Sequence, residues 1–492
     1  MSEAGGPVAA RRVFWWTLLG VVLLQSAWSM SISSFRGPDE FDHAYKTAAV
    51  ARAQLGTDGA AQRGRGGIVT VPRGLVSAAE RACESRSYTD HDNCHPIDEP
   101  APGLARVATA AGAYNPAWYA VVGTATRWVP GADLGPAIRV VGALLSALLI
   151  AWAAATTASW STTRWPLLAL SVAATPTLVY STVIVAPNGV HYAAAMLTWS
   201  SALGFARGRE RAGHYLVPFT AGASILVSTH TTGPMWLAIA GVAVLLLRPS
   251  HWWLDLIRPA AGRWALAAAV AVTATLASMA WARSAGANAL GAADPSLPPF
   301  HAGLLVRSEI LWPFQTVGAF PMRNDQAPWL AYIIWFTIFL TLCGLGLKRA
   351  TGRARLAALV VVLGVVTIPA VLTAISFASN GLAWQGRYAL PLSIGMPLLA
   401  GWCLDRNPVR MSARLPLLVG IAFGVAQLVS VVHVATQEMR EYPVDPLAGR
   451  FPGGIVLMSL LALSGPILSV AFSARAARST ARSEDRVPVS VP

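Results

Sequence analysis

The sequence predicts an all-α polytopic membrane protein with about 12 transmembrane helices and a large first extracytoplasmic loop. The chain is 54% hydrophobic and only 12% charged, whereas soluble domains carry about 25% charged residues. Its mean hydropathy is +0.51. Apolar stretches of roughly 20 residues, the length that crosses a ~30 Å hydrocarbon core, recur from Val13 to Phe472. A soluble fold built around one hydrophobic core is therefore excluded.

The elements follow in order along the chain. Residues 1–12 form a cytoplasmic N-terminus. Residues 13–35 form a retained first span, because no small-x-small cleavage site precedes the charged residues that follow. Residues 36–136 form an extracytoplasmic loop with juxtamembrane helices, and residues 137–472 form a helix bundle with outer loops at 283–328 and 437–452. Residues 473–492, rich in Ser, Arg, Val and Pro, are expected to be a disordered cytoplasmic tail. The expected spans are 13–35, 137–158, 166–186, 189–206, 214–231, 234–247, 264–282, 329–347, 356–378, 388–404, 415–434 and 454–472. Re-entrant hairpins are the alternative around Pro187 and Gly233.

The formal charge of +14 follows the topology. With alternating spans, the side of the N-terminus carries 20 of the 37 Lys and Arg residues and six of the 23 acids, so the opposite side is balanced. This distribution is the positive-inside rule, and it argues against a nucleic-acid partner. Both termini are expected in the cytoplasm, and membrane lipids are the expected surroundings.

The large outer loop contains two further features. Tyr114 to Tyr119 is an aromatic stretch that suits a juxtamembrane helix at the headgroup level, with a short true span as the alternative. Cys83 and Cys94 lie in a compartment that permits disulfides and are expected to pair. A metal site is the alternative, because His91 and His95 flank Cys94, but the spacing matches no common zinc motif.

Directly after the first span, the chain reads Gly37-Pro38-Asp39-Glu40-Phe41-Asp42-His43-Ala44-Tyr45-Lys46. Proline followed by acids is typical of a helix start, which explains the acids without any function. On a helix, Asp39, Asp42, His43 and Lys46 also share one face, and such a cluster can bind a proton, a hydroxyl group or a divalent cation.

A second group lies in a short outer connection, Trp384-Gln385-Gly386-Arg387-Tyr388-Ala389-Leu390-Pro391. The guanidinium of Arg387 is a planar set of donors suited to phosphate. A headgroup anchor is the alternative, because Arg and Tyr at a span end routinely contact lipid.

Taken together, these residues resemble a bacterial multi-pass family called domain of unknown function 2142. The resemblance rests on Pro-Asp-Glu-x-x-His after the first span, Asn-Pro-x-x-Tyr at Asn115 to Tyr119, Arg139 at a span mouth, and Gln-Gly-Arg-Tyr-x-x-Pro from Gln385. It runs from about Ser31 to Pro397. Two positions depart from the pattern: Pro187-Asn188 stands where members commonly show Pro-Asp, and His230 stands where a Lys is frequent.

That family is related to the glycosyltransferase C (GT-C) superfamily of polyprenyl-phosphate-sugar-dependent transferases. The resemblance implies a GT-C-like fold in the bacterial cytoplasmic membrane. It also implies transfer of a sugar from a polyprenyl-phosphate-linked donor to an envelope glycan or lipid acceptor on the outer side. A non-catalytic role in envelope assembly is one alternative. A transporter or flippase is another, although such proteins keep their binding groups near the bilayer midplane.

The resemblance and the chemistry of the side chains together give the expected site. Asp39 or Glu40 is expected to be the catalytic base. Arg387, with Arg36 or Arg139, is expected to stabilise the leaving phosphate. The remaining substrate-binding residues are expected to be His43, Tyr119, Gln385 and Tyr388. A divalent cation held by Asp39, Asp42 and His43 is a further expectation, and no other cofactor is implied.

Overall fold

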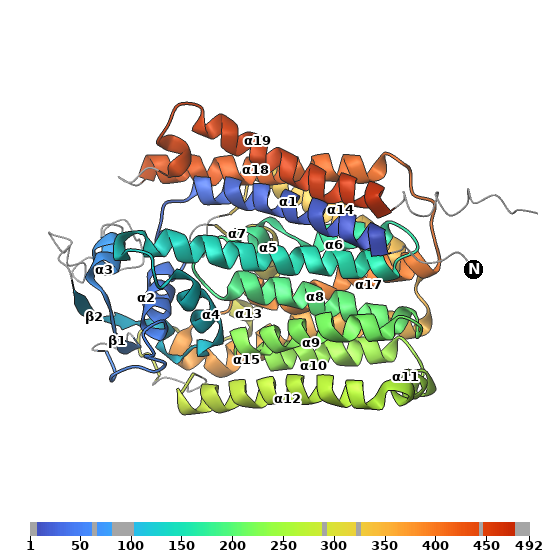
Figure 1. Cartoon of the computed structure of the whole chain (residues 1–492), viewed down its shortest axis with the longest axis horizontal. Helices are drawn as coiled ribbons and strands as arrows, with labels where there is room; N and C mark the ends of the chain where they lie inside the picture. Colours follow the sequence, from blue (N-terminus) through green and yellow to red (C-terminus); the bar gives the residue numbers. More distant parts are fainter. Residues whose placement is uncertain are drawn as a thin grey trace, which may run out of the picture.

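The computed structural model describes residues 7–61, 66–80, 103–287, 293–320, 326–441 and 446–477. Long helices lie alongside one another, and a small assembly of short helices and two strands caps one end of the bundle (Figure 1). We call this end the loop end. The opposite end, where the N-terminus lies, is the N-terminal end.

Every apolar segment predicted from the sequence coincides with a helix or a pair of helices. The uninterrupted helices are α1 (Pro7–Ser31), α5 (Leu134–Trp160), α8 (Asn188–Arg207), α9 (Ala212–Thr229), α10 (Gly233–Leu246), α12 (Ala261–Ser284), α14 (Trp329–Arg349), α15 (Gly352–Asn380), α18 (Leu415–Glu441) and α19 (Gly454–Ile467). Within the described residues, seven helices are long and apolar enough to cross a membrane. The helical membrane architecture is therefore confirmed, whereas the count of twelve spans stays a prediction.

Two of the predicted spans are broken into shorter helices. The first consists of α6 (Trp165–Ala173) and α7 (Pro176–Thr182), and the second of α16 (Leu390–Ser393) and α17 (Gly395–Arg406). Thr175 causes the first break, because its side chain accepts a hydrogen bond from the backbone N–H of Leu178 and starts a new helix, with proline at the next position. Such interruptions place irregular backbone next to the candidate site described below.

Three helices extend or add to the prediction. Helix α13 (Ala302–Val317) lies within the expected outer loop 283–328. Helix α11 (Ser250–Ile257) precedes α12 at the N-terminal end, joined to it by the turn η5 (Arg258–Ala260). Helix α18 continues to Glu441, so the connection to α19 begins later than the expected residue 437.

The loop end is built from the segment between α1 and α5. Its elements are α2 (Glu40–Val50), β1 (Gly67–Pro72), α3 (Arg73–Glu80), β2 (Leu104–Thr109), η3 (Ala110–Ala113), α4 (Pro116–Thr126) and η4 (Gly131–Asp133). The two strands pair antiparallel, with Gly67 opposite Thr109 and Pro72 opposite Leu104. Helix α4 has 11 residues and so spans ~16 Å, about half of the ~30 Å hydrocarbon core. It is therefore too short to be the alternative membrane span.

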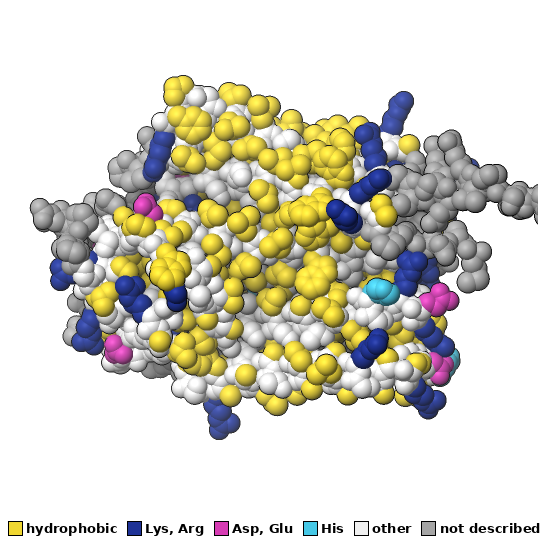
Figure 2. Space-filling view, viewed as in Figure 1, with side chains coloured by type: hydrophobic (Ala, Val, Ile, Leu, Met, Phe, Trp, Pro, Cys, Tyr) yellow, Lys and Arg dark blue, Asp and Glu magenta, His cyan; other side chains and the backbone are white. Residues whose placement is uncertain are grey.

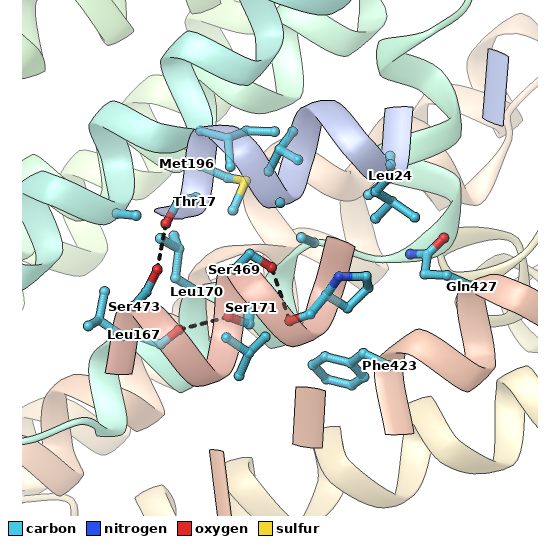
Figure 3. A pocket seen from close by; sticks show the side chains of 18 residues that line it. Thr17, Leu24, Leu167, Leu170, Ser171, Met196, Phe423, Gln427, Ser469 and Ser473 are labelled. Carbon is cyan, nitrogen blue, oxygen red and sulfur yellow. Dashed lines mark hydrogen bonds between the residues drawn. The ribbon is translucent and has the colours of Figure 1, made fainter. Parts of the chain in front are cut away.

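Close helix packing holds the bundle together. Helices α1 and α19 meet at Gly20 and Gly465, where a Cβ on Gly20 would lie 2.5 Å from the carbonyl oxygen of Gly465. Beside this contact lies a cavity of about 60 Å³, lined mostly by apolar side chains of α1, α5, α6, α18 and the C-terminal turn η8 (Leu468–Phe472) (Figure 3). The hydroxyls of Thr17 and Ser473 bond to each other across it at 3.1 Å. None of the residues lining it is titratable.

Figure 2 shows Lys and Arg side chains at both ends of the bundle, and several of those at the N-terminal end have partners. Arg207 pairs with the buried Asp405 at 2.9 Å, and Arg209 pairs with Asp255 at 3.0 Å. Arg248 lies over the ring of Trp252, with 4.1 Å to its centroid. The predicted basic segments therefore lie together at one end. That this end faces the cytoplasm stays a prediction.

Candidate functional site

Glu40 is the most tightly held acid of the predicted site. Its side chain is fully buried. One carboxylate oxygen accepts hydrogen bonds from Arg139 Nε at 3.2 Å and from the backbone N–H of Val185 at 2.8 Å. The other accepts from Arg139 Nη2 at 2.7 Å and from the backbone N–H of Gly37 at 2.9 Å. Because both oxygens accept two bonds, Glu40 holds the start of α2 against α5 and the segment after α7.

Two of the three predicted phosphate-binding arginines are also engaged by the protein. The remaining Arg139 donors bond to the backbone carbonyls of Ile32 and Ser33, each at 3.1 Å. Arg36 forms a buried ion pair with Glu438 of α18, with 3.3 Å between Nη2 and Oε1. Buried carboxylates therefore already neutralise Arg36 and Arg139, and these pairs hold the end of α1 in place. Their role in phosphate binding stays a prediction.

Asp39 differs from its neighbour in both conformation and exposure. It is half-buried and precedes α2 with φ 57° and ψ 16°, in the left-handed region, and its side chain makes no capping hydrogen bond. Left-handed backbone is costly for residues other than glycine, although Asp and Asn tolerate it better than most. Asp39 therefore precedes the helix without capping it through its side chain.

Charged groups from three parts of the chain surround His43. Burial lowers the pKa of His43 to about 4, and the charges of Asp39 and Glu40 oppose this shift. The positive charge of Arg387 lowers the His43 pKa further. Asp39 and Arg387 therefore act on one buried imidazole, although more than 300 residues separate them in the chain.

Two tyrosines of the aromatic stretch Tyr114 to Tyr119 contact His43. Tyr119 lies in α4, and Tyr114 lies just before this helix. The hydroxyl of the buried Tyr119 lies 2.7 Å from His43 Nδ1. The ring of Tyr114 stands edge-on to the His43 ring, with centroids 5.1 Å apart. Burial raises the pKa of both tyrosines, so their hydroxyls stay protonated. Tyr119 therefore contacts His43 directly, and its role in substrate binding stays a prediction.

The expected cation site needs correction. Across the described ranges, no three His, Cys, Asp or Glu side chains are grouped so as to hold a metal ion. The reason is local: Asp42 accepts a hydrogen bond from the backbone N–H of Ala110 at 2.7 Å, and His43 Nδ1 faces Tyr119. Asp39, Asp42 and His43 therefore do not form a metal site.

Arg387 lies in η6 (Gly386–Ala389), and α13 holds this turn in place. The backbone N–H of Gly386 donates to the side-chain oxygen of Gln315 at 2.8 Å. A Cβ on Gly386 would lie 2.0 Å from the carbonyl oxygen of Trp312, so this approach requires glycine. Sequence reasoning did not identify Gln315, because it lies in a segment that was expected to be a loop.

Arg387 is the arginine of this group that the protein leaves without a counter-ion. Its side chain is only 5% exposed. Among the described residues, no carboxylate lies within ion-pair distance, and the buried Nε has no hydrogen-bond partner. Its guanidinium lies over the ring of Tyr388, 5.5 Å from the centroid. An exposed anchor would be hydrated, whereas a buried cation without a carboxylate partner is costly unless a ligand neutralises it.

Two histidines complete the cluster. His230 lies between α9 and α10, and its ring centroid is 5.9 Å from that of Tyr388 and 5.4 Å from that of His191. Tyr388 also contacts Trp384, with centroids 5.6 Å apart. In the sequence, His230 stood out only as a departure from the family pattern, and His191 gave no signal at all.

An apolar cavity of about 350 Å³ adjoins η6. Gly386, Ala389 and Trp384, neighbours of Arg387 in the chain, line it, whereas Arg387 itself is not among its lining residues. Most of the remaining wall consists of apolar and aromatic side chains, including Trp335, Phe336, Phe339, Val365 and Pro397. Its polar members are Thr175, Glu309, Thr316 and Ser393. Gln385 is buried at the start of η6. The predicted pair Cys83 and Cys94 lies outside the described residues.

Comparisons with known proteins found a similar solved structure and a matching family. A solved structure, ArnT from Cupriavidus metallidurans bound to undecaprenyl phosphate, is similar over 94% of this chain and 77% of that chain. The identity is 14% and the TM-score 0.44. No curated protein matches the chain. The sequence pattern of the family described as "Predicted membrane protein (DUF2142)" matches residues 22–396, about three quarters of the chain. The chain therefore belongs to the DUF2142 family of membrane proteins.

Proposed function

We propose that the protein is a membrane glycosyltransferase that moves a sugar from a polyprenyl-phosphate-linked donor to a cell-envelope acceptor at the loop end. The observation that carries the proposal is the buried Arg387 guanidinium, which has no carboxylate partner among the described residues and lies in one cluster with Asp39 and His43. A buried cation, a half-buried carboxylate and a neutral imidazole in one cluster suit the transfer of a group away from phosphate.

The donor phosphate is assigned to Arg387. A guanidinium binds phosphate oxygens through a planar pair of N–H groups, and this binding is strongest where water is excluded. Arg36 and Arg139 are already paired with buried carboxylates, so they would have to give up 2.7 to 3.3 Å contacts to bind a ligand. Arg387 has no ion pair with a described carboxylate, so it can bind phosphate without breaking one.

The polyprenyl chain is assigned to the cavity beside η6. Gly386 and Ala389 form its wall on either side of Arg387, so a phosphate bound there would have its hydrocarbon tail next to apolar side chains. Burying such a chain gains roughly 0.8 kcal/mol per methylene group. This arrangement also explains why a broken span, α16 and α17, stands at this place: irregular backbone within a bundle is tolerated where it lines a cavity.

Asp39 is proposed as the general base, and Glu40 as the residue that positions it. In the transfer step, the acceptor hydroxyl oxygen forms a bond to the anomeric carbon of the sugar, and the bond from that carbon to the phosphate oxygen breaks. The acceptor proton passes to the Asp39 carboxylate, and the bonding electrons leave with the polyprenyl phosphate, whose charge Arg387 stabilises. Glu40 is unsuited to the role of base, because Arg139 and two backbone N–H groups occupy both of its oxygens.

The direct test is transfer by the purified protein in lipid nanodiscs. Polyprenyl-phosphate sugars with a radiolabelled sugar are supplied together with extracted envelope glycolipids, and release of polyprenyl phosphate and labelling of the acceptor are both measured. Asp39→Asn and Arg387→Lys are expected to lose at least 100-fold in rate while the protein remains folded.

Two matched controls lie at the same end of the molecule. Asp133 also precedes a helix, α5, without a capping bond, and it is exposed, so Asp133→Asn is expected to keep full activity. Arg127 is exposed and lies 4.0 Å from the Trp128 ring centroid, as a headgroup anchor does, so Arg127→Lys is expected to be silent. Full transfer by Asp39→Asn would contradict the assignment of the base. Movement of donor lipid across the bilayer without transfer would favour a flippase.

A further inference from the structure

The hydrogen bonds around His230 determine which of its ring nitrogens carries the proton. The backbone N–H of Thr232 donates to His230 Nδ1 at 3.3 Å, and the Thr232 hydroxyl lies 2.9 Å from the same nitrogen. A backbone N–H can only donate, so Nδ1 must be an acceptor and carry no proton. His230 is therefore a neutral imidazole with its proton on Nε2.

His191, whose ring lies next to it, is held in the opposite form. The hydroxyl of Thr229 donates its proton to the backbone carbonyl of Ile225 at 2.8 Å. It can therefore only accept from His191 Nδ1, which lies 2.8 Å away. His191 thus has its proton on Nδ1, and its Nε2 is an acceptor.

Within the part of the chain that the structure describes, His230 Nε2–H has no hydrogen-bond partner. None of the hydrogen bonds of the described residues involves this atom, and it is not among the buried atoms without partners. The His230 ring lies beside Tyr388, over which the Arg387 guanidinium lies. This places a neutral donor next to the guanidinium that has no counter-ion.

We propose that His230 is a second anion-binding residue: its Nε2–H, fixed by Thr232, donates a hydrogen bond to an oxygen of the same phosphate group that Arg387 binds. The ligand class is a phosphate ester of a lipid, and the inference rests on the proposed function for the identity of that lipid. His191 cannot take this role, because its Nε2 would present a lone pair to the anion.

A neutral donor has a physical advantage at this place. The positive charge of Arg387 makes it unfavourable for a nearby group to become a second cation. The N–H dipole of a neutral imidazole attracts the phosphate without adding a positive charge. Since Thr232 fixes the tautomer before the ligand arrives, the donor needs no rearrangement on binding. The proton also remains available to the leaving phosphate oxygen throughout the transfer.

The test measures binding rather than transfer, with undecaprenyl phosphate as the probe. Equilibrium binding of the radiolabelled lipid to the intact protein in detergent micelles is compared between variants. The amide nitrogen of glutamine can occupy the place of Nε2, whereas that of asparagine reaches only the place of Nδ1. His230→Gln is therefore expected to bind within about threefold of wild type, and His230→Asn and His230→Phe about tenfold or more weaker. The same three substitutions at His191 serve as matched controls and are expected to show no such order.

A spectroscopic readout keeps the inference separate from effects on folding. In protein labelled with ¹⁵N-histidine, the signals lost in His230→Gln and His191→Gln identify the two rings. The His230 ring should show an unprotonated Nδ1 and a protonated Nε2, and the His191 ring the reverse. Thr232→Val should disturb the pattern of His230 alone.

The outcomes separate this inference from the proposed function. If Arg387→Lys weakens binding and His230→Asn does not, the His230 assignment fails and the phosphate site stands. If neither variant weakens binding, both fail. A protonated Nδ1 on His230 would also overturn the inference, whatever the binding data show.

Discussion

Removal of the charge on Glu40 is the sharpest test of how the site is built. Glu40→Gln keeps the size and shape of the side chain but replaces one accepting oxygen by an NH₂ group. In the structure, four N–H groups point at the two carboxylate oxygens, at 2.7 to 3.2 Å. The amide can satisfy two of them at most. The other donors, including one side of the Arg139 guanidinium, would face an N–H group.

The expected cost follows from the burial of both partners. The Glu40 side chain is 0% exposed and that of Arg139 8% exposed. Breaking a buried ion pair by removing one charge costs about 3 to 5 kcal/mol, because the remaining ion has lost both water and partner. An acid that only marks an exposed helix start contributes ~0.3 to 1 kcal/mol. The two explanations of the acidic motif therefore differ several-fold in predicted effect.

The free energy of unfolding is measured in mixed micelles by titrating a denaturing detergent and following helical content. Glu40→Gln is expected to lose about 3 kcal/mol. Asp39→Asn is expected to lose less than about 1 kcal/mol, because Asn also tolerates left-handed backbone. The double variant Glu40→Gln with Arg139→Met should recover part of the loss, since it removes both charges. If Glu40→Gln is as stable as Asp39→Asn, the assignment of Glu40 as a structural ion-pair partner is refuted.

Four further outcomes are expected. Arg387→Lys should weaken binding of polyprenyl phosphate at least tenfold with little change in stability, because lysine cannot offer a planar pair of donors; unchanged binding would indicate a lipid anchor. Gly386→Ala should destabilise the fold by about 1 to 3 kcal/mol, because its Cβ would lie 2.0 Å from the Trp312 carbonyl oxygen; a stability equal to wild type would contradict that contact. His43 has its pKa lowered by burial from 6.5 to about 4, so the unfolded chain binds more protons between these values and stability should fall as the pH drops through this window, by about 3 kcal/mol in full; His43→Gln should abolish that dependence. A cysteine introduced at the exposed Asp58 should react with an impermeant reagent in intact cells; reaction only after lysis would invert the topology.

Hydropathy alone predicted where helices form, and it failed where polar residues interrupt them. The apolar segments all became helices, since length and composition decide that outcome in a membrane. Helix α13 escaped detection because Arg307, Ser308 and Glu309 break its apolar run. The short sheet of β1 and β2 also gave no signal, because strands this short do not show a clear alternation of polar and apolar residues.

The residues of the candidate site also fall into those that the sequence predicted and those that it did not. Residues with a local signature, such as Asp39, His43 and Arg387, were identified from their motifs, and in the structure the charges of Asp39 and Arg387 both act on the His43 pKa. Their partners were not predictable, since Glu438 lies about 400 residues from Arg36 and no pattern connects them. A sequence can show that an arginine is present. Whether the protein has already neutralised it depends on tertiary contacts.

This difference between the arginines sets the charge that a ligand can bring. Arg36 and Arg139 each face a buried carboxylate, whereas among the described residues Arg387 has no carboxylate at ion-pair distance. A sugar linked through a single phosphate is a diester with one negative charge, which Arg387 matches. A diphosphate linkage carries a second negative charge. The other two described arginines of the site, Arg36 and Arg139, are already paired with carboxylates, so this second charge would be buried without a counter-ion, which is costly. Under the proposed function, this count of charges predicts that the site binds a monophosphate-linked lipid carrier more tightly than a diphosphate-linked one.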